Sequence, residues 1–280
     1  MNSRRSFLKK SAALTLGVAC APSFYSMAGK KVKNVGVQLY SVRKEITADA
    51  IGTLKKLASL GYQQIESARS DKGNYYGLAP KEIKKVCADL GMTIRSGHIH
   101  IDENFKKSID SATEAGQEYL ICSTMPTEGQ TVDNYKKVAE AFNKAGEECK
   151  KNNIKFGYHN HEYEFAQDKG TVLYDVLLAN TDAKLVHMEL DLGWVIVAGK
   201  DPLDYFKRFP GRFPLWHLKD MDLQKKHSTE FGKGGLNITQ MLTNSEQSGM
   251  KYFFVEQEEY ASTALESLKY DIDFLKKLEY

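Results

Sequence analysis

Residues 51–66, IGTLKKLASLGYQQIE, contain the unit from which the fold can be predicted. The first ten residues place their apolar side chains at helical spacing, which predicts an amphipathic helix. Gly61 follows, and glycine readily adopts the left-handed backbone that ends a helix. The remaining residues, 63–66, predict a short strand. The unit is therefore a helix, a glycine stop and a strand.

The same unit recurs along the chain, in residues 83–98, 109–122 and 238–256. Further strands are predicted at residues 35–39, 154–161, 185–191 and 213–219, and the clearest further helix at 134–151. Alternating helices and strands imply a parallel sheet with helical crossovers. Eight strands fit a closed (β/α)8 TIM barrel. The competing open, doubly wound sheet lacks support, because no Gly-x-Gly-x-x-Gly follows the first strand. No linker divides residues 29–280, which predicts one α/β domain.

The composition is that of an ordinary globular protein. Of the 280 residues, 42% are hydrophobic and 27% are charged, which excludes a disordered or fibrous chain. The net charge of +3 comes from the N-terminus, where residues 1–28 hold four basic side chains and no acidic one. The remaining residues carry 35 of the 39 basic side chains and all 36 acidic ones. Nothing in this balance favours nucleic-acid binding.

Residues 1–28 have the layout of a bacterial export signal. The Arg4-Arg5 pair precedes Phe7-Leu8-Lys9, as in twin-arginine signals, and Ser26-Met27-Ala28 provides a small-residue cleavage site. The intervening apolar run is shorter than the roughly 20 residues of a stable membrane span. We therefore expect export to the periplasm. Lipid anchoring at Cys20 is the less favoured alternative, because the residues before it form a poor acceptor sequence.

Three cysteines remain beyond the signal, and each lies in an apolar helix or strand pattern. An odd number in such patterns predicts buried free thiols, at Cys87, Cys122 and Cys149. Their spacing does not match a cysteine-based zinc site.

Ionisable residues stand at the predicted carboxyl ends of most strands, where the active sites of TIM barrels lie. They are Glu66, His98, His100, His159, His161, Glu162, Asp191, His217, Lys219, Asp220, Glu256 and Glu258. Burying so many carboxylates and imidazoles together without a cation is costly. Mixed histidine and carboxylate ligands suit Mn²⁺, Zn²⁺, Co²⁺ or Fe²⁺ better than Ca²⁺. The sequence thus predicts a divalent metal site.

Four motifs resemble those of the xylose-isomerase-like sugar isomerase/epimerase superfamily: residues 157–165 (GYHNHEYEF), 191–194 (DLGW), 216–220 (WHLKD) and 255–257 (VEQ). The resemblance extends from Val35 to the last helix. It implies a (β/α)8 barrel that holds a divalent metal with Glu, Asp, His and Glu from strands five to eight. Asp191, His217 and Glu256 match the last three positions. His159 stands at the first, where the family usually has glutamate, and Glu162 is a nearby substitute.

The family mechanism implied by this resemblance is isomerisation or epimerisation of a sugar. The metal polarises a carbonyl and stabilises an enediolate, while a carboxylate moves the adjacent proton. Carried over by position, Glu256 is a metal ligand and the proton-transferring base, with His159 or Glu162 opposite.

The same resemblance suggests substrate contacts. His98, His161 and Lys219 are expected to bind substrate hydroxyls, although a salt bridge from Lys219 to Asp220 is an equal alternative. Trp194 and Tyr40 are expected to form an apolar wall against the C–H face of a sugar, with core packing as the alternative.

The glycine-rich residues 231–238 suggest either an anion-binding loop or a lid. Expected export argues against a phosphorylated sugar, so the predicted partner is a free sugar or a keto-glycoside. A lyase that opens 3-keto-glycosides by β-elimination and a non-catalytic sugar-binding barrel stay open as alternatives. A related apurinic endonuclease is disfavoured, because it needs a basic DNA-binding face. The oligomeric state is left open.

Overall fold

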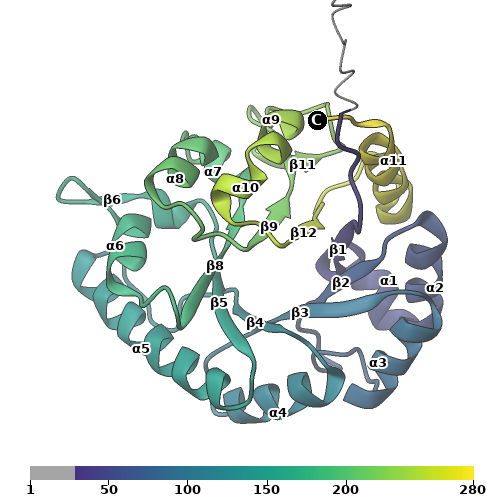
Figure 1. Ribbon diagram of the computed structural model, residues 1–280, viewed down its shortest axis with the longest axis horizontal. Coiled ribbons are helices and arrows are strands. Elements are labelled where there is room, and N and C mark those ends of the chain that lie inside the picture. Colours follow the sequence, from purple (N-terminus) through teal and green to yellow (C-terminus); the bar gives the residue numbers. More distant parts are fainter. Residues whose placement is uncertain (1–28) are drawn as a thin grey trace, which may run out of the picture.

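The eight predicted strands are all present in the computed structural model, which describes residues 29–280 (Figure 1). They are β1 (Gly36–Gln38), β2 (Gln64–Ser67), β3 (Thr93–Ile99), β4 (Tyr119–Cys122), β5 (Lys155–His159), β8 (Val186–Asp191), β9 (Leu215–Leu218) and β12 (Tyr252–Val255). All pair in parallel and close into a barrel in the order β1-β12-β9-β8-β5-β4-β3-β2. The prediction of a single (β/α)8 TIM barrel is confirmed.

Helices surround the barrel on its outer side (Figure 1). They are α1 (Arg43–Ala48), α2 (Ala50–Leu60), α3 (Pro80–Asp89), α4 (Phe105–Ala115), α5 (Val132–Lys151), α6 (Leu173–Asn180), α7 (Leu192–Val197), α8 (Pro202–Arg208), α9 (Ile238–Thr243), α10 (Ser245–Ser248) and α11 (Ala264–Lys277). Two small antiparallel sheets decorate the loops: β6 (Gln167–Asp168) with β7 (Thr171–Val172), and β10 (Asp220–Asp222) with β11 (His227–Thr229). The glycine stop is visible at the end of α2, where Gly61 has a φ of 107°.

Inside the barrel, an apolar layer separates the amino-terminal mouth from a polar layer above it. The apolar layer is a small buried cluster of Tyr119, Ile121, Leu215 and Phe254. Side chains two residues apart on a strand share a face. His217 therefore follows Leu215 into the interior, and Glu256 follows Phe254. This alternation brings the ionisable side chains together at the carboxyl ends of the strands.

Two other predictions concern regions away from the barrel mouth. Cys87, Cys122 and Cys149 are buried free thiols, as expected, and burial raises the pKa of each to about 12. The export signal and Cys20 lie in residues 1–28, outside the described residues. Between residues 29 and 280, no helix combines the length and apolar character needed to cross a membrane.

The glycine-rich residues 231–238 are organised around the side chain of Asp220. One carboxylate oxygen, Oδ1, accepts hydrogen bonds from the backbone N–H groups of Met221 and Leu236, both at 2.9 Å. The other oxygen, Oδ2, accepts from Gly232 at 2.9 Å and Gly234 at 3.0 Å. Of the two predicted roles of this loop, anion binding and a lid, the first would use amides that here bind a carboxylate of the chain itself. Asp220 is therefore a loop anchor, not a partner of Lys219.

A second buried carboxylate supports the same loop and should make stability depend on pH. Asp271, on α11, accepts the N–H of Phe231 at 2.8 Å, and its Oδ2 has no hydrogen-bond partner. Burial, helped by the charges of Glu230 and Asp220, raises the pKa of Asp271 from 3.8 to about 8. The folded chain therefore keeps a proton that the unfolded chain loses near pH 4. We expect the free energy of unfolding to fall as pH rises from about 4 to 8, by roughly 1.4 kcal/mol per unit.

Urea denaturation at pH 5 and pH 8 measures this effect. Asp271→Asn should be more stable than the parent chain at pH 8, and its pH slope should be less negative than that of the parent chain by about 1.4 kcal/mol per unit. The matched control is Asp273→Asn on the same helix, where the carboxylate is exposed and pairs with Lys269. Equal slopes in the parent chain and Asp271→Asn would contradict the assignment.

Candidate active site

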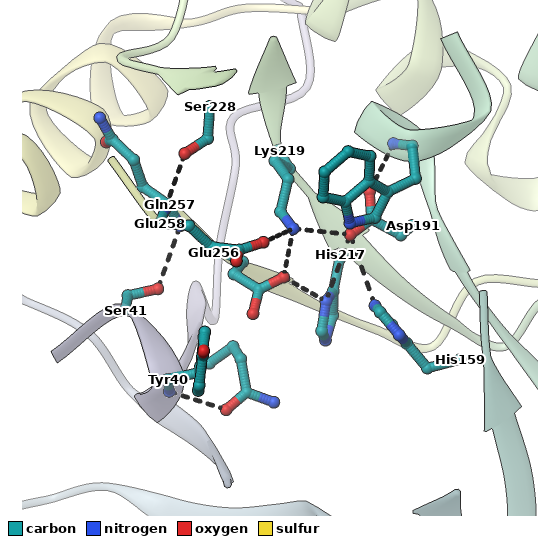
Figure 2. Close-up of polar contacts among 12 residues, drawn as sticks. Tyr40, Ser41, His159, Asp191, His217, Lys219, Ser228, Glu256, Gln257 and Glu258 are labelled. Atoms are coloured by element: carbon teal, nitrogen blue, oxygen red, sulfur yellow. Dashed lines mark hydrogen bonds and ion pairs between the residues drawn. The ribbon is translucent and has the colours of Figure 1, made fainter. Parts of the chain in front are cut away.

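Four ligand-type side chains meet where β5, β8, β9 and β12 end. His159 is the last residue of β5, Asp191 the last of β8, His217 lies in β9, and Glu256 directly follows β12. All four are buried, and one ligand atom from each lies within 4.8 Å of the others. We refer to them as the candidate metal group (Figure 2). They are the four residues that the sequence analysis assigned to the metal.

The polar atoms of this group are poorly satisfied without a cation. Among residues 29–280, neither ring nitrogen of His159 has a hydrogen-bond partner and Asp191 Oδ2 accepts no hydrogen bond, although all three atoms are buried. His159 Nε2 lies 3.4 Å from Asp191 Oδ2, and His217 Nδ1 lies 2.8 Å from Glu256 Oε2 and 3.6 Å from Asp191 Oδ2. Such converging N and O atoms fit a divalent ion of the Mn²⁺ to Zn²⁺ type.

Charge and burial prepare these groups as ligands. Burial, together with the charge of His217, holds the pKa of His159 well below its usual value, so its imidazole is neutral and offers a lone pair. Burial alone would raise the pKa of Asp191, but the positive charge of Lys219 and the nearby imidazoles of His159 and His217 hold it well below the usual range. Burial would likewise raise the pKa of Glu256, but the charges of Lys219 and His217 have the larger effect and hold this pKa below its usual value.

A second set of ionisable residues, the supporting group, lies beside the first and shares His217 with it. Its members are Glu66, His98, Glu189 and His217, and all are buried. His217 Nε2 contacts Glu66 Oε1 at 2.7 Å, and His98 Nε2 contacts Glu189 Oε2 at 2.9 Å. Glu66 also accepts hydrogen bonds from Gln38 at 2.6 Å and Ser96. Glu66 therefore has three donors, from His217, Gln38 and Ser96, whereas Glu189 Oε1 has no hydrogen-bond partner among residues 29–280.

The supporting group fixes the orientation of His217. The Nε2–H of His217 donates to Glu66, and the other ring nitrogen, Nδ1, therefore points at the candidate metal group. Such a carboxylate contact on the far nitrogen is the usual way in which a metal-binding histidine is oriented. Among residues 29–280 we therefore take the first group as the candidate ligand set and the supporting group as the set that positions it.

Lys219 lies against the candidate metal group. Its Nζ donates a hydrogen bond to Glu258 Oε1 at 2.7 Å and forms ion pairs with Glu256 Oε2 at 2.7 Å and Asp191 Oδ2 at 3.0 Å (Figure 2). The ammonium also lies 5.0 Å from the ring centroid of Trp194. Although burial opposes its charge, the three carboxylates raise the pKa of Lys219 well above its usual value.

A cavity of about 260 Å³ opens above these residues. It is lined by Tyr40, Ala68, Arg69, His98, His100, Ser123, Thr124, His159, His161, Trp194, Glu256 and Glu258. Two of its walls come from nearly opposite sides of the barrel, since β5 ends at His159 and leads into His161, and β12 leads into Glu256 and Glu258. A small molecule in this cavity would contact two members of the candidate metal group directly.

A family model described as xylose isomerase-like TIM barrel matches residues 54–278. The chain belongs to this family. Among solved structures, this xylose isomerase-like barrel is similar to a sugar phosphate isomerase/epimerase from Parabacteroides distasonis ATCC 8503, with 29% identity and a TM-score of 0.79 over 88% of this chain and 99% of the other. It also shares its fold with the IOLI protein with a binding zinc atom, with 13% identity and a TM-score of 0.67 over 86% of this chain and 96% of the other.

Curated relatives of this xylose isomerase-like barrel are matched over a shorter length. An inosose dehydratase from Clostridium perfringens (strain 13 / Type A) is 32% identical over 108 residues, which are 39% of this chain and 35% of that protein. The match therefore spans about a third of the length of the relative.

The other predicted substrate contacts of the xylose isomerase-like barrel divide into two sets. Tyr40, His98, His161 and Trp194 all line the cavity. Lys219 was expected to bind hydroxyls, but it is buried behind the wall, with its ammonium engaged by three carboxylates. Glu162 is half-exposed and lies 3.6 Å from Lys226, so it is not among the residues that line the cavity.

Several functional neighbours were not singled out from the sequence as site residues. Gln38 and Ser96 hold Glu66, while Glu258 holds Lys219. The positions of Glu66 and Glu258 at strand ends were sequence signals for a place in the site. Gln38 gave a weaker signal, because it is a polar residue at the end of a buried strand and is in register with Glu66.

Proposed function

We propose that this chain is a metal-dependent enzyme that removes the proton next to a carbonyl of a sugar or related polyol, and acts as an isomerase or epimerase. The observation that supports this most is the candidate metal group itself, in which buried ligand atoms lack hydrogen-bond partners and two members line the cavity. Sugar isomerase/epimerase and dehydratase names among similar proteins support the same chemistry.

The charges of the buried cluster support a divalent ion in particular. Four buried carboxylates carry four negative charges when ionised: Glu66, Glu189, Asp191 and Glu256. Lys219 supplies one positive charge. His98 supplies another, because Glu66 and Glu189 raise its pKa to about 9 although burial lowers it. Burial opposes a charge on His217, but Glu189 and Glu256 raise its pKa well above the usual value, so it supplies a third positive charge in the metal-free chain. A divalent ion that takes His217 as a neutral ligand would replace that proton and bring the total to zero. Buried clusters that approach neutrality avoid a large desolvation penalty.

A bound divalent ion would supply Lewis-acid stabilisation of negative charge on a carbonyl oxygen. Glu256 suits the role of ligand better than that of base, because its depressed pKa makes it a weak proton acceptor. Glu258 and His161 line the cavity from nearly opposite strands, and His161 Nδ1 has no hydrogen-bond partner. We assign proton transfer to these two groups. His98 would donate to a substrate hydroxyl, and Trp194 would contact its C–H face.

Elimination is the second candidate function, and one observation favours it. Epimerases of this type use a carboxylate on each side of the substrate, but His159 occupies the β5 position here, and Glu162 faces Lys226 instead of the cavity. A lyase needs only one proton acceptor and one group that assists the leaving group. The inosose dehydratase relatives are consistent with such a reaction.

Solvent-deuterium exchange separates these functions. The chain is loaded with Mn²⁺, incubated in D₂O with a ketohexose, a keto-inositol and a methyl 3-keto-glucoside, and followed by proton NMR. We expect loss of the signal next to the carbonyl, dependent on the metal and abolished by chelator. A new stereoisomer identifies epimerisation, and release of methanol or water identifies elimination. Absence of exchange with Mn²⁺, Co²⁺ and Zn²⁺ alike would leave only a sugar-binding barrel.

A further inference from the structure

The oxygen atoms of the candidate metal group are already in contact with a cation of the chain. Asp191 Oδ2 and Glu256 Oε2 face the imidazoles of His159 and His217. The ammonium of Lys219 forms its ion pairs with these same two oxygens, at 3.0 Å and 2.7 Å. Lysine and metal would therefore share both carboxylate atoms.

The two oxygens of Asp191 have different surroundings. Its Oδ1 accepts the N–H of Trp194 at 2.9 Å, which caps the first turn of α7. Its Oδ2 is the oxygen that faces both His159 and Lys219, and it is therefore the atom for which an ion and Lys219 would compete. The ion pair with Lys219 lacks hydrogen-bond geometry, since Oδ2 accepts no hydrogen bond. The hydrogen bond of Lys219 goes to Glu258, at the edge of the cavity. The lysine can thus remain bound to Glu258 when an ion occupies the other two carboxylates.

We infer that Lys219 is a built-in competitor of the divalent ion: its ammonium neutralises the carboxylates of the metal-free site and thereby lowers the affinity of the site for metal. This inference rests on the cation site of the proposed function. Two positive charges that share the same oxygens repel each other, and a buried location weakens solvent screening of that repulsion. The side chain also stabilises the metal-free chain, because it leaves no carboxylate of this pair without a counter-charge.

Metal titration of the full chain tests the inference without measuring turnover. Mn²⁺ binding is followed by the electron paramagnetic resonance signal of the free ion, and Co²⁺ binding by its visible absorption. Lys219→Met removes the ammonium and keeps an unbranched side chain, and it should lower the Kd for Mn²⁺ at least tenfold. Lys219→Arg keeps the charge and should stay closer to the parent chain. Lys226→Met is the matched control, because this exposed lysine near Glu162 lies outside the site, and its Kd should change less than twofold.

Thermal denaturation provides a second readout and a check on folding. In chelator, Lys219→Met should unfold at a lower temperature than the parent chain, and Mn²⁺ should raise its Tm by more than it raises that of the parent. If Lys219→Met binds Mn²⁺ no more tightly than the parent chain does, the inference is wrong. The proposed function would still hold in that case, because the parent chain itself binds the ion. Binding by Lys219→Met alone would support the competition and overturn metal dependence of the parent chain. Binding by neither would overturn both.

Discussion

Glu256→Gln is expected to abolish metal-dependent proton exchange, with a loss of about 10³-fold or more, a scale typical of removing a principal electrostatic group. Glutamine keeps the size of the side chain and one oxygen acceptor but loses the negative charge. Glu256 Oε2 is the atom that faces His217 at 2.8 Å and Lys219 at 2.7 Å, so the substitution removes a metal ligand and unbalances both neighbours. Deuterium exchange and Mn²⁺ titration measure the two consequences separately, and metal affinity should fall at least tenfold, as for loss of an ordinary ligand contact.

Glu162→Gln provides the control for that experiment, because it makes the same chemical change in the same region. Glu162 is half-exposed and contacts Lys226 instead of the candidate metal group. Exchange rate and metal affinity should both stay within about twofold of the parent chain, as for surface ion pairs generally. The reverse pattern, with Glu162→Gln inactive and Glu256→Gln active, would show that the cation lies elsewhere. Thermal denaturation establishes that both variants are folded.

The fold could be predicted because its signals are local. The strands β2, β3, β4 and β12 each follow a helix that a glycine closes, as Gly61 closes α2. The predicted strand at 119–122 matches β4, and the others differ from the structure only at their ends. Helix starts were harder: α4 begins at Phe105, earlier than the predicted 109, since no side chain caps its N-terminus. A capping residue is the usual sequence signal for such a start.

The candidate metal group could be predicted because strand ends of a barrel converge, whatever the details of packing. Glu162 is a residue for which the prediction from strand ends was wrong. Alternation of side chains holds only while the backbone is extended, and β5 ends at His159, followed by a short 3-10 helix at Tyr163–Phe165. Glu162, three positions after His159 and beyond the end of β5, does not share the face that His159 occupies. The ion pairs of Lys219 with Asp191, Glu256 and Glu258 depend on the distances between three strands. A local sequence pattern does not give these distances, so the ion pairs could not be predicted.

Asp220→Ala is expected to cause the largest loss of stability, about 3–5 kcal/mol in the free energy of unfolding. The carboxylate of Asp220 is buried and accepts four backbone N–H groups, from Met221, Gly232, Gly234 and Leu236. Alanine leaves these donors without an acceptor, and each unsatisfied buried group costs roughly 1–3 kcal/mol, reduced where water can enter. Urea denaturation measures the loss, and Asp220→Asn, which retains one acceptor oxygen, should fall between alanine and the parent chain.

Asp222→Ala tests whether the loss of stability in Asp220→Ala comes from the four unpaired amides or would follow from removing any aspartate of β10. Asp222 accepts the N–H groups of Gln224 and Lys225, at 3.0 and 3.1 Å on the surface, and forms an exposed ion pair with Lys225 at 3.4 Å. Its loss should cost about 1 kcal/mol or less. If Asp220→Ala is as stable as Asp222→Ala, the loop amides must find other acceptors, and inorganic phosphate becomes the first to test. If phosphate then stabilises Asp220→Ala but not the parent chain, the carboxylate of Asp220 fills a position that an anion could otherwise occupy.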